Sequence, residues 1–313
     1  MITLGIVSPC YNEEKILSIS ASKFANLLDR LIDSGKISND SFVLFVNDGS
    51  KDSTWDIITE LHERDSKFKG LNLAHNSGHQ NAIMAGMMTA KDWCDAIVTI
   101  DADIQDDINA IERMIDEHSK GAEIVYGIKV SRTADPLLKR MSAIAFYKLQ
   151  QKMGVDCLYN HADFRFMSKR ALDMLAEYKE KNLYLRALIQ KIGLPSTTVD
   201  DVICEREAGE SKYTLSKMLH LAIDGVTSFS TKPIYILLYV GIIFLAIALF
   251  ILCDVTHSMI TGNAVSGWVS LILSIWFVGG ALMTGLATIG IYIGKIYTEV
   301  KGRPLYHIQD ILN

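Results

Sequence analysis

The first 130 residues alternate short apolar runs with longer stretches in which apolar positions recur three and four residues apart. The short runs predict buried strands, and the longer stretches predict amphipathic helices. The alternation predicts an α/β fold with a mostly parallel sheet that is covered by helices on both faces. The expected strands are residues 2–9, 42–48, 70–75, 96–101 and 122–127, and the expected helices are 13–33, 53–65, 79–90 and 106–118.

From about residue 136 to residue 195 the pattern becomes mostly helical, and the stretch ADFRFMSKR (162–170) interrupts it. The stretch TTVDDVICEREAGESKY (197–213) predicts a strand that leads into a glycine-containing turn. Residues 215–230 again have helical periodicity, which predicts a helix along a membrane surface.

Two long apolar runs follow, at residues 234–253 and 268–294, and neither contains a charged residue. Each has at least ~20 residues, which is enough to cross a hydrocarbon core of ~30 Å. Lysine and arginine flank the outer ends of the pair, whereas the connecting segment has none, so both ends are expected in the cytoplasm. The sequence predicts a cytosolic domain (1–210), a juxtamembrane amphipathic helix (211–232) and a two-helix transmembrane hairpin with a short cytosolic tail (233–313), placed in the cytoplasmic membrane.

Composition excludes several classes of protein. The net charge of −5 and the lack of a basic stripe with aromatic residues argue against a nucleic-acid partner. The five cysteines have no CxxC or zinc-type spacing, which suits reduced thiols in the cytosol. No GxGxxG or GxxxxGK[ST] follows a predicted strand, which argues against a dinucleotide fold and a P-loop. The N-terminus lacks the basic region and the long apolar stretch of a signal peptide.

Carboxylates gather where one predicted strand ends, in VTIDADIQDD (98–107). If the strand continues, Asp101, Asp103 and Gln105 project to one side and form a row of oxygen ligands. Such ligands suit Mg²⁺ or Mn²⁺, which keeps open positions for substrate phosphates. The alternative is an acidic loop in which Asp106 or Asp107 caps the next helix.

Polar residues after other strands are further candidates. Asp48 could accept from a base imide or a ribose hydroxyl, although Asp-Gly is also a common turn. Glu13 could meet ribose and Tyr11 could cover the base, or both could be ordinary residues at a helix start. Asp163 precedes FRFM, where it could reach the ligand edge of the sheet or lie in a solvated loop.

Basic residues provide candidate phosphate contacts near the first apolar run. Arg206, Ser211 and Lys212 lie in the predicted turn, where a guanidinium fork, a hydroxyl and an ammonium could hold a lipid phosphate. Arg132 lies in a basic segment that could form a flap near an acceptor. Both segments could equally be solvated surface.

Six motifs in order resemble one known family: SPCYNEE, VNDGSKDST, HNSGHQNAIMAG, DADIQDD, DFRFMSKRAL and REAGESKY. They resemble family 2 glycosyltransferases with the GT-A fold. More narrowly, they are similar to polyprenyl-phosphate glycosyltransferases, a group that includes bactoprenol glucosyltransferases and dolichol-phosphate mannose synthases. The ending IGIYIGKIYTEVKGRPLYHI also resembles the bacterial branch, so the resemblance covers nearly the whole chain.

The resemblance implies a role for each candidate. Asp101, Asp103 and Gln105 would bind the metal and the donor diphosphate, and Asp163 would be the catalytic carboxylate, with Asp103 as a second catalytic candidate. Because an acceptor phosphate is already largely ionised, Asp163 could orient the acceptor or the sugar instead of removing a proton. The nucleoside would be held by Pro9, Tyr11, Glu13 and Asp48, and the phosphates by Arg206, Ser211 and Lys212. Cys10 departs from the family pattern, which often has a small, β-branched or aromatic residue there, and Asn47 stands where an aspartate is common. These departures put the nucleoside selectivity in doubt.

The function that these features predict is metal-dependent, inverting transfer of a sugar from a nucleotide-sugar to polyprenyl phosphate at the cytoplasmic membrane face. The donor would be UDP-glucose or a UDP-N-acetylhexosamine. The alternatives are a GDP-mannose-using mannosyltransferase and a non-catalytic, membrane-tethered sensor of sugar nucleotides. Gly290 and Gly294 form a GxxxG in the second apolar run, which would allow a homo-oligomer through the membrane helices.

Overall fold

The computed structural model describes residues 1–129, 161–202, 232–261 and 268–313. These residues form two compact units. The first contains residues 1–129, 161–202 and 303–313, and the second contains 232–261 and 268–302. The predicted membrane-surface helix at 211–232 lies almost wholly outside the described residues.

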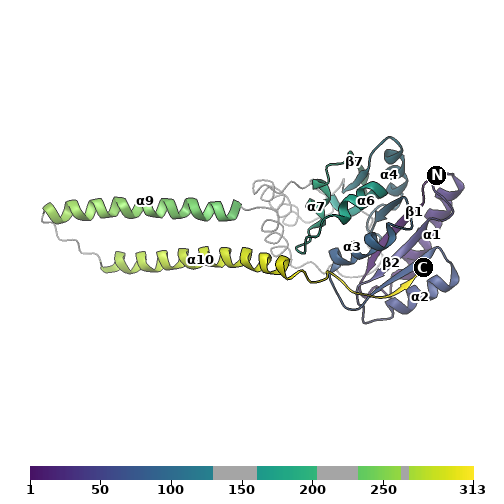
Figure 1. The fold of residues 1–313 in the computed structure, drawn as a ribbon, viewed down its shortest axis with the longest axis horizontal. Coiled ribbons are helices and arrows are strands. Elements are labelled where there is room, and N and C mark those ends of the chain that lie inside the picture. The colour runs from purple at the N-terminus through teal and green to yellow at the C-terminus, as the bar shows by residue number, and fades with distance from the viewer. Residues whose placement is uncertain (130–160, 203–231, 262–267) are drawn as a thin grey trace. The chain divides into compact units, whose positions relative to one another are not determined.

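The first unit is an α/β fold (Figure 1). The expected strands and helices of the first 130 residues are all present, with shifts of a few residues at their ends. The strands are β1 (Leu4–Cys10), β2 (Phe42–Asn47), β3 (Phe68–Leu73), β4 (Ala96–Thr99), β5 (Ile124–Lys129), β6 (His161–Ser168), β7 (Ser196–Asp201) and β8 (Ile308–Leu312). The helices are α1 (Leu17–Asp33), α2 (Thr54–Arg64), α3 (His79–Ala90), α4 (Ala110–Ser119), α6 (Lys169–Ala176) and α7 (Leu185–Lys191).

The sheet is mixed, so the prediction of a mostly parallel sheet was only partly right. The strand order is β7-β5-β6-β4-β1-β2-β3-β8. Strands β4, β1, β2 and β3 run parallel, as does the β5–β7 pair. Strand β6 lies antiparallel between β4 and β5, and β8 pairs antiparallel with β3. Apolar runs do not encode strand direction, and both antiparallel strands come from the chain beyond residue 160.

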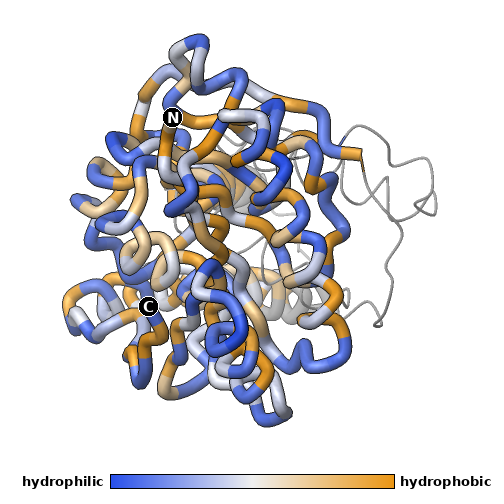
Figure 2. The backbone as a smooth tube through the Cα atoms, turned by 90° about the vertical axis from the view of Figure 1, so that its right-hand side faces the viewer, coloured by the Kyte–Doolittle hydropathy of each residue, from blue (hydrophilic) through white to orange (hydrophobic). Residues whose placement is uncertain are grey.

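Helices cover both faces of the sheet because alternate strand residues point to opposite sides. On one face Ile6 and Val98 belong to a core cluster with Phe24 of α1 and Ile111 of α4. On the other face α3 packs so closely that a Cβ at Gly86 would lie 2.4 Å from a Val7 methyl. Figure 2 shows apolar and polar segments alternating along this unit.

The second unit contains two long helices, α9 (Lys232–Thr261) and α10 (Trp268–Lys301) (Figure 1). Within α10, the segment Phe277–Lys301 is long and apolar enough to cross a membrane. It is the one such segment among the described residues, since the apolar part of α9 that can be assessed, Lys232–Ile243, is shorter. The predicted two-helix transmembrane hairpin is therefore not shown, whereas one apolar helix suited to a membrane anchor is.

The last strand was not predicted. Residues 303–313 were expected to be a short tail, but Ile308–Leu312 forms β8 and extends the sheet of the first unit. Leu312 packs against the core cluster. The chain thus returns to the first unit after its apolar helices.

Candidate functional site

The candidate residues follow β1, β2 and β4, which run parallel and end at the same edge of the sheet. In open α/β sheets ligands bind outside the carboxyl ends of the strands. Pro9 is buried inside β1, and Tyr11 follows it with 38% of its surface exposed.

Hydrogen bonds join the loop after β1 to the residues that follow β2. The Asn12 backbone N–H donates to Ser50 Oγ at 3.0 Å, and the Lys51 N–H donates to Asn12 Oδ1 at 2.9 Å. The Glu13 N–H donates to Thr54 Oγ1 at 2.9 Å. The structure therefore places Tyr11 and Glu13 in a loop that is hydrogen-bonded to the residues after β2.

Asp48 is buried and holds a third loop in place. Its Oδ1 accepts from the Ser77 N–H at 2.6 Å and its Oδ2 accepts from the Gly78 N–H at 3.0 Å. Burial raises the pKa of this carboxyl, and the two backbone hydrogen bonds oppose that rise. Next to it Gly49 has φ +62, and a Cβ there would lie 2.5 Å from the backbone of Asn76. Asp48 thus joins the loop after β2 to the loop before α3.

Asp101 and Asp103 do not continue the strand, which corrects the expected row of side chains. Strand β4 ends at Thr99, and the Ile104 N–H donates to the Asp101 carbonyl at 3.3 Å. Ile104 has φ +47, in the left-handed region. The Gln105 N–H faces Asp103 Oδ1 at 3.4 Å. The three residues lie on a turn at the end of the strand, so alternation along an extended chain does not orient them.

Asp163 lies in β6 and is surrounded by cations. Arg165 Nη2 donates to its Oδ1 at 2.6 Å, and Arg186 Nη2 donates to its Oδ2 at 3.2 Å. His79 Nε2 is 3.5 Å from Asp163 Oδ2 and 3.6 Å from Asp101 Oδ1. The Thr99 hydroxyl donates to the Asp163 carbonyl at 2.5 Å, which fixes β6 beside the end of β4. The structure therefore brings Asp163 and Asp101 together on either side of His79.

The charges in this cluster shift its pKa values. Burial alone would raise the pKa of Asp163, but Arg186, His79 and Arg165 lower it well below its ordinary value. Desolvation opposes the charge on His79, yet Asp101 and Asp163 raise its pKa to about 9. The Asp101 side chain is 46% exposed, but the surrounding protein atoms and the carboxylates of Asp106, Asp163 and Asp103 raise its pKa to about 6. At neutral pH Asp163 is a carboxylate and His79 is an imidazolium.

Sequence reasoning missed His79, Arg165 and Arg186, which come from α3, β6 and α7. Arg165 is fully buried beside its counter-charge, and Arg186 is 23% exposed. A charged residue inside the apolar alternation FRFM was the available signal for Arg165. Nothing local marks Arg186, whose helix is held to α3 by the Leu185 N–H donating to Gln80 Oε1 at 2.8 Å.

Four candidates lie outside the described residues: Arg132, Arg206, Ser211 and Lys212. Their assignment to phosphates stays a prediction. Among the described residues, no group of three or more His, Cys, Asp and Glu side chains is arranged to hold a metal ion.

Two buried carboxylates, Asp106 and Asp201, lie next to the turn at residues 101–103, which we call the DAD turn. Asp201, at the end of β7, accepts from the Asp107 N–H at 2.8 Å, and Asp106 forms an ion pair with Lys129 at 3.1 Å. Burial and the neighbouring Asp106 raise the pKa of Asp201 to about 7.

Helix α4 begins at Ala110 with Asn109 at its N-cap position, so neither Asp106 nor Asp107 is the N-cap that the alternative interpretation expected. Asp107 Oδ1 instead accepts from the Asn109 N–H at 3.0 Å.

We expect Asp201→Asn to stabilise the protein at alkaline pH. A folded-state pKa above the unfolded value means that the folded chain keeps a proton which the unfolded chain releases, so the free energy of unfolding falls as pH rises from about 4 to 7. Asparagine does not titrate, so its free energy of unfolding lacks this fall with pH, and its side-chain oxygen can still accept from the Asp107 N–H. Thermal unfolding from pH 4.5 to 8 should show a gain that is largest at pH 8. The exposed neighbour variant Asp200→Asn is the control, and equal pH dependence in the two variants would contradict the prediction.

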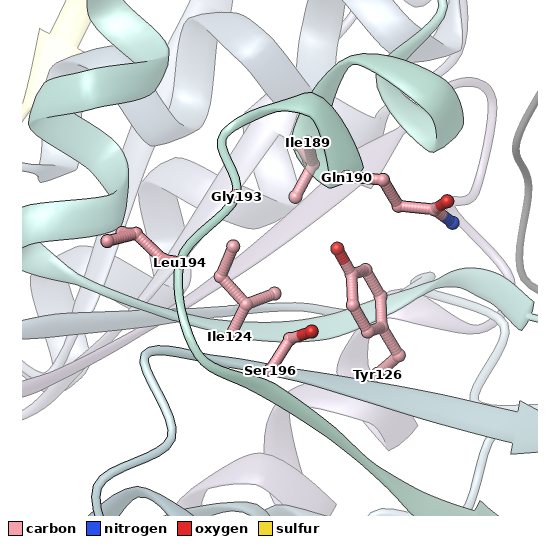
Figure 3. Close-up of a pocket in the computed structure, with 7 residues that line it drawn as sticks. All are labelled: Ile124, Tyr126, Ile189, Gln190, Gly193, Leu194 and Ser196. Atoms are coloured by element: carbon pink, nitrogen blue, oxygen red, sulfur yellow. The ribbon is translucent and has the colours of Figure 1, made fainter.

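A pocket of about 230 Å³ lies between β5 and the end of α7 (Figure 3). Figure 3 shows the Tyr126 ring directing its hydroxyl toward α7. None of the candidate residues lines this pocket. Its lining residues are Ile124, Tyr126, Ile189, Gln190, Gly193, Leu194 and Ser196.

Comparisons with known proteins agree on a family. The description "Glycosyl transferase family 2" matches residues 5–175. The uncharacterized glycosyltransferase YkoT of Bacillus subtilis is 44% identical over 311 residues, which cover 99% of this chain and 92% of that protein. The bactoprenol glucosyl transferase of Shigella phage SfII is 34% identical over 311 residues, covering 98% of this chain and 97% of its own.

One solved structure has a weak overall likeness to this chain. The mannosyltransferase PcManGT from Pyrobaculum calidifontis, in complex with GDP-Man and Mn²⁺, is 13% identical, with a TM-score of 0.45. The alignment covers 96% of this chain and 87% of that one. The fold that the first unit itself shows is α/β with a mixed sheet.

Proposed function

This chain belongs to glycosyl transferase family 2 and is a glycosyltransferase, and from that premise we propose that it transfers a sugar from a nucleotide-sugar to polyprenyl phosphate. The observation that carries the proposal is the cluster of Asp101, His79, Asp163 and Arg186 at the carboxyl edge of the sheet. Carboxylates and cationic side chains lie next to each other in this cluster. A site for a metal-bound diphosphate needs both, because carboxylates bind the metal and cations contact the phosphate oxygens.

The acceptor is proposed from the relatives and from the apolar helix. Relatives named bactoprenol glucosyl transferase align along nearly their whole length, including the part that matches α10. The exposed apolar side chains of α10, such as Leu282 and Ile293, suit a lipid environment. A polyprenyl phosphate would offer a reacting phosphate at the membrane surface, and Arg206, Ser211, Lys212 and Arg132 are proposed to hold phosphate groups there.

A divalent metal, Mg²⁺ or Mn²⁺, is proposed for the DAD turn. The residues of the turn suit such an ion by their chemistry, because two carboxylates and one carboxamide follow β4 and these are the hard oxygen donors that it prefers. Asp101, Asp103 and Gln105 would supply oxygen ligands, and substrate oxygens would complete the set. The ion, when bound, would neutralise charge that develops on the departing diphosphate.

The proposed chemistry is a single displacement. A phosphate oxygen of the acceptor forms a bond to the anomeric carbon while the bond from that carbon to the donor diphosphate breaks, and the electron pair leaves with the diphosphate. The anomeric configuration is inverted. The acceptor phosphate, with a second pKa of about 6, is already largely ionised at neutral pH, so no general base is needed.

We assign Asp163 a positioning role within this reaction. Its pKa is lowered well below the ordinary value, which makes it a weak base, and its carboxylate binds Arg165 and Arg186 and adjoins His79. It would hold the two more exposed cations, His79 and Arg186, toward the phosphates of donor and acceptor. Pro9, Tyr11, Glu13 and Asp48 are proposed to shape the nucleoside site.

We also propose the identity of the donor and the membrane topology. The donor is a UDP-sugar, with glucose or N-acetylhexosamine as the sugar, and the chain has two membrane spans with both ends in the cytoplasm. A homo-oligomer through Gly290 and Gly294 is also a proposal.

The test is transfer from radiolabelled UDP-glucose, UDP-N-acetylglucosamine, UDP-N-acetylgalactosamine and GDP-mannose to undecaprenyl phosphate. Each reaction is run with Mg²⁺, with Mn²⁺ and with EDTA, using the full chain in detergent. We expect label in the lipid phase with one of these donors and only when metal is present. Nucleotide binding without lipid label from any donor would contradict the proposed function and would favour the sensor.

A further inference from the structure

Hydrogen bonds connect the strand β8 to the loop after β2 (residues 48–50). We call this loop the donor loop, because Asp48 in it is proposed to shape the nucleoside site. Strand β8 pairs with β3 so that Asp310 lies opposite Asn72. The Ala74 N–H donates to the His307 carbonyl at 2.9 Å, just beyond this pairing. Strand β3 therefore has a neighbour on each side: β2, which leads into the donor loop, and β8.

Side chains continue this connection across three strands. Asn72 Nδ2 donates to Asp310 Oδ2 at 3.0 Å, and Asn47 Nδ2 donates to Asn72 Oδ1 at 2.8 Å. Asn47 Oδ1 in turn accepts from the Ser50 N–H at 3.2 Å. We call these three hydrogen bonds the amide relay. It ends at the loop after β2, in which Asp48 holds the loop before α3 and Ser50 accepts from Asn12.

The relay has one direction, which Asp310 requires from one end and the Ser50 N–H from the other. A carboxylate only accepts hydrogen bonds, so the Asn72 amide must turn its NH₂ group toward Asp310 and its oxygen toward Asn47. Asn47 then donates to Asn72 and keeps its own oxygen for the Ser50 N–H. Asn47 and Asn72 are 3% and 7% exposed, so water cannot replace a lost partner at little cost. An aspartate at position 47 could not donate to Asn72, which gives the departure at Asn47 a physical role.

We propose that β8 is part of the donor-binding apparatus and that Asp310 is a positioning residue, which orients Asn72 and Asn47 and so fixes the loop 48–50. The inference rests on the proposed function, because it takes that loop to bind the nucleoside. Six residues separate the end of α10 from β8. The donor site is therefore complete only after the chain has passed through its apolar helices and has added its last strand to the sheet.

The experiment uses the full chain in detergent and three variants. Asp310→Ala removes the acceptor at the end of the relay, whereas Asp310→Asn keeps an oxygen that can accept from Asn72. Gln309→Ala changes an exposed side chain on the same strand and is the matched control. Because Asp310 is itself exposed, we expect all three variants to fold, with a lower thermal midpoint only in Asp310→Ala, in which the buried Asn72 loses its acceptor.

The first readout is hydrogen exchange in peptides that cover residues 47–53. It needs no donor and reports the relay directly through the Ser50 N–H. We expect faster exchange in Asp310→Ala, and wild-type exchange in Asp310→Asn and Gln309→Ala. Unchanged exchange in Asp310→Ala would overturn the proposal.

The second readout is calorimetric binding of UDP, with GDP in parallel. We expect the dissociation constant for the nucleotide that binds to rise about fivefold in Asp310→Ala, the size expected for one lost hydrogen bond. Normal nucleotide binding in Asp310→Ala together with faster exchange would overturn the donor-site role of β8. If the wild type bound neither nucleotide, the proposed function would fail by itself, whereas the exchange result would still decide the relay.

Discussion

Asp103→Ala is expected to reduce sugar transfer to polyprenyl phosphate by about a hundredfold to a thousandfold, the range that follows loss of a main electrostatic contact in a transition state. Asp103 lies on the turn after β4 and is partly exposed. Among its contacts, the Gln105 N–H faces its carboxylate at the long distance of 3.4 Å. The fold should therefore tolerate alanine, while the proposed metal loses one of its two carboxylates.

Three measurements are needed on this variant. Transfer is followed as labelled lipid at several Mn²⁺ concentrations, thermal unfolding reports folding, and Mn²⁺ binding is measured by titration in the presence of the nucleoside diphosphate. Asp33→Ala, an exposed carboxylate at the end of α1, is the control and should behave as wild type. Normal transfer by a folded Asp103→Ala protein would remove the DAD turn from the proposed site.

The elements around this turn could be predicted from the sequence because parallel strands buried on both faces need apolar runs. Strands β1 and β2 are buried at every residue, and the stretches between the strands show the amphipathic spacing of helices. The ends of elements were less certain. Strand β4 stops two residues before Asp101, so the row of ligands along an extended strand did not form.

The partners of Asp163 could not be predicted for a different reason. His79, Arg165 and Arg186 meet it through long-range packing of α3, β6 and α7, and no local pattern records which distant helices adjoin a strand. The same holds for β8, a strand of five residues that pairs with a segment more than two hundred residues earlier. Within the first 130 residues sequence patterns predicted which elements form, while tertiary pairing decided what surrounds the candidate site.

Asp163→Asn is expected both to destabilise the fold and to abolish transfer. Arg165 is 0% exposed and Asp163 is 13% exposed, and Arg165 Nη2 donates to Asp163 Oδ1 at 2.6 Å. Breaking a buried ion pair from one side leaves an uncompensated charge and costs about 3–5 kcal/mol. Loss of transfer in this variant alone would therefore not separate misfolding from a role in the reaction.

The double variant Asp163→Asn/Arg165→Met separates the two effects. Removal of both buried charges should restore the thermal midpoint close to that of the wild type, because methionine fills the space of the arginine stem. Arg186 and His79 are 23% and 44% exposed and stay solvated without their carboxylate. They would no longer be held toward the phosphates, so transfer should stay at least a hundredfold below wild type. Recovery of transfer along with stability would show that Asp163 serves the fold alone and would contradict its positioning role.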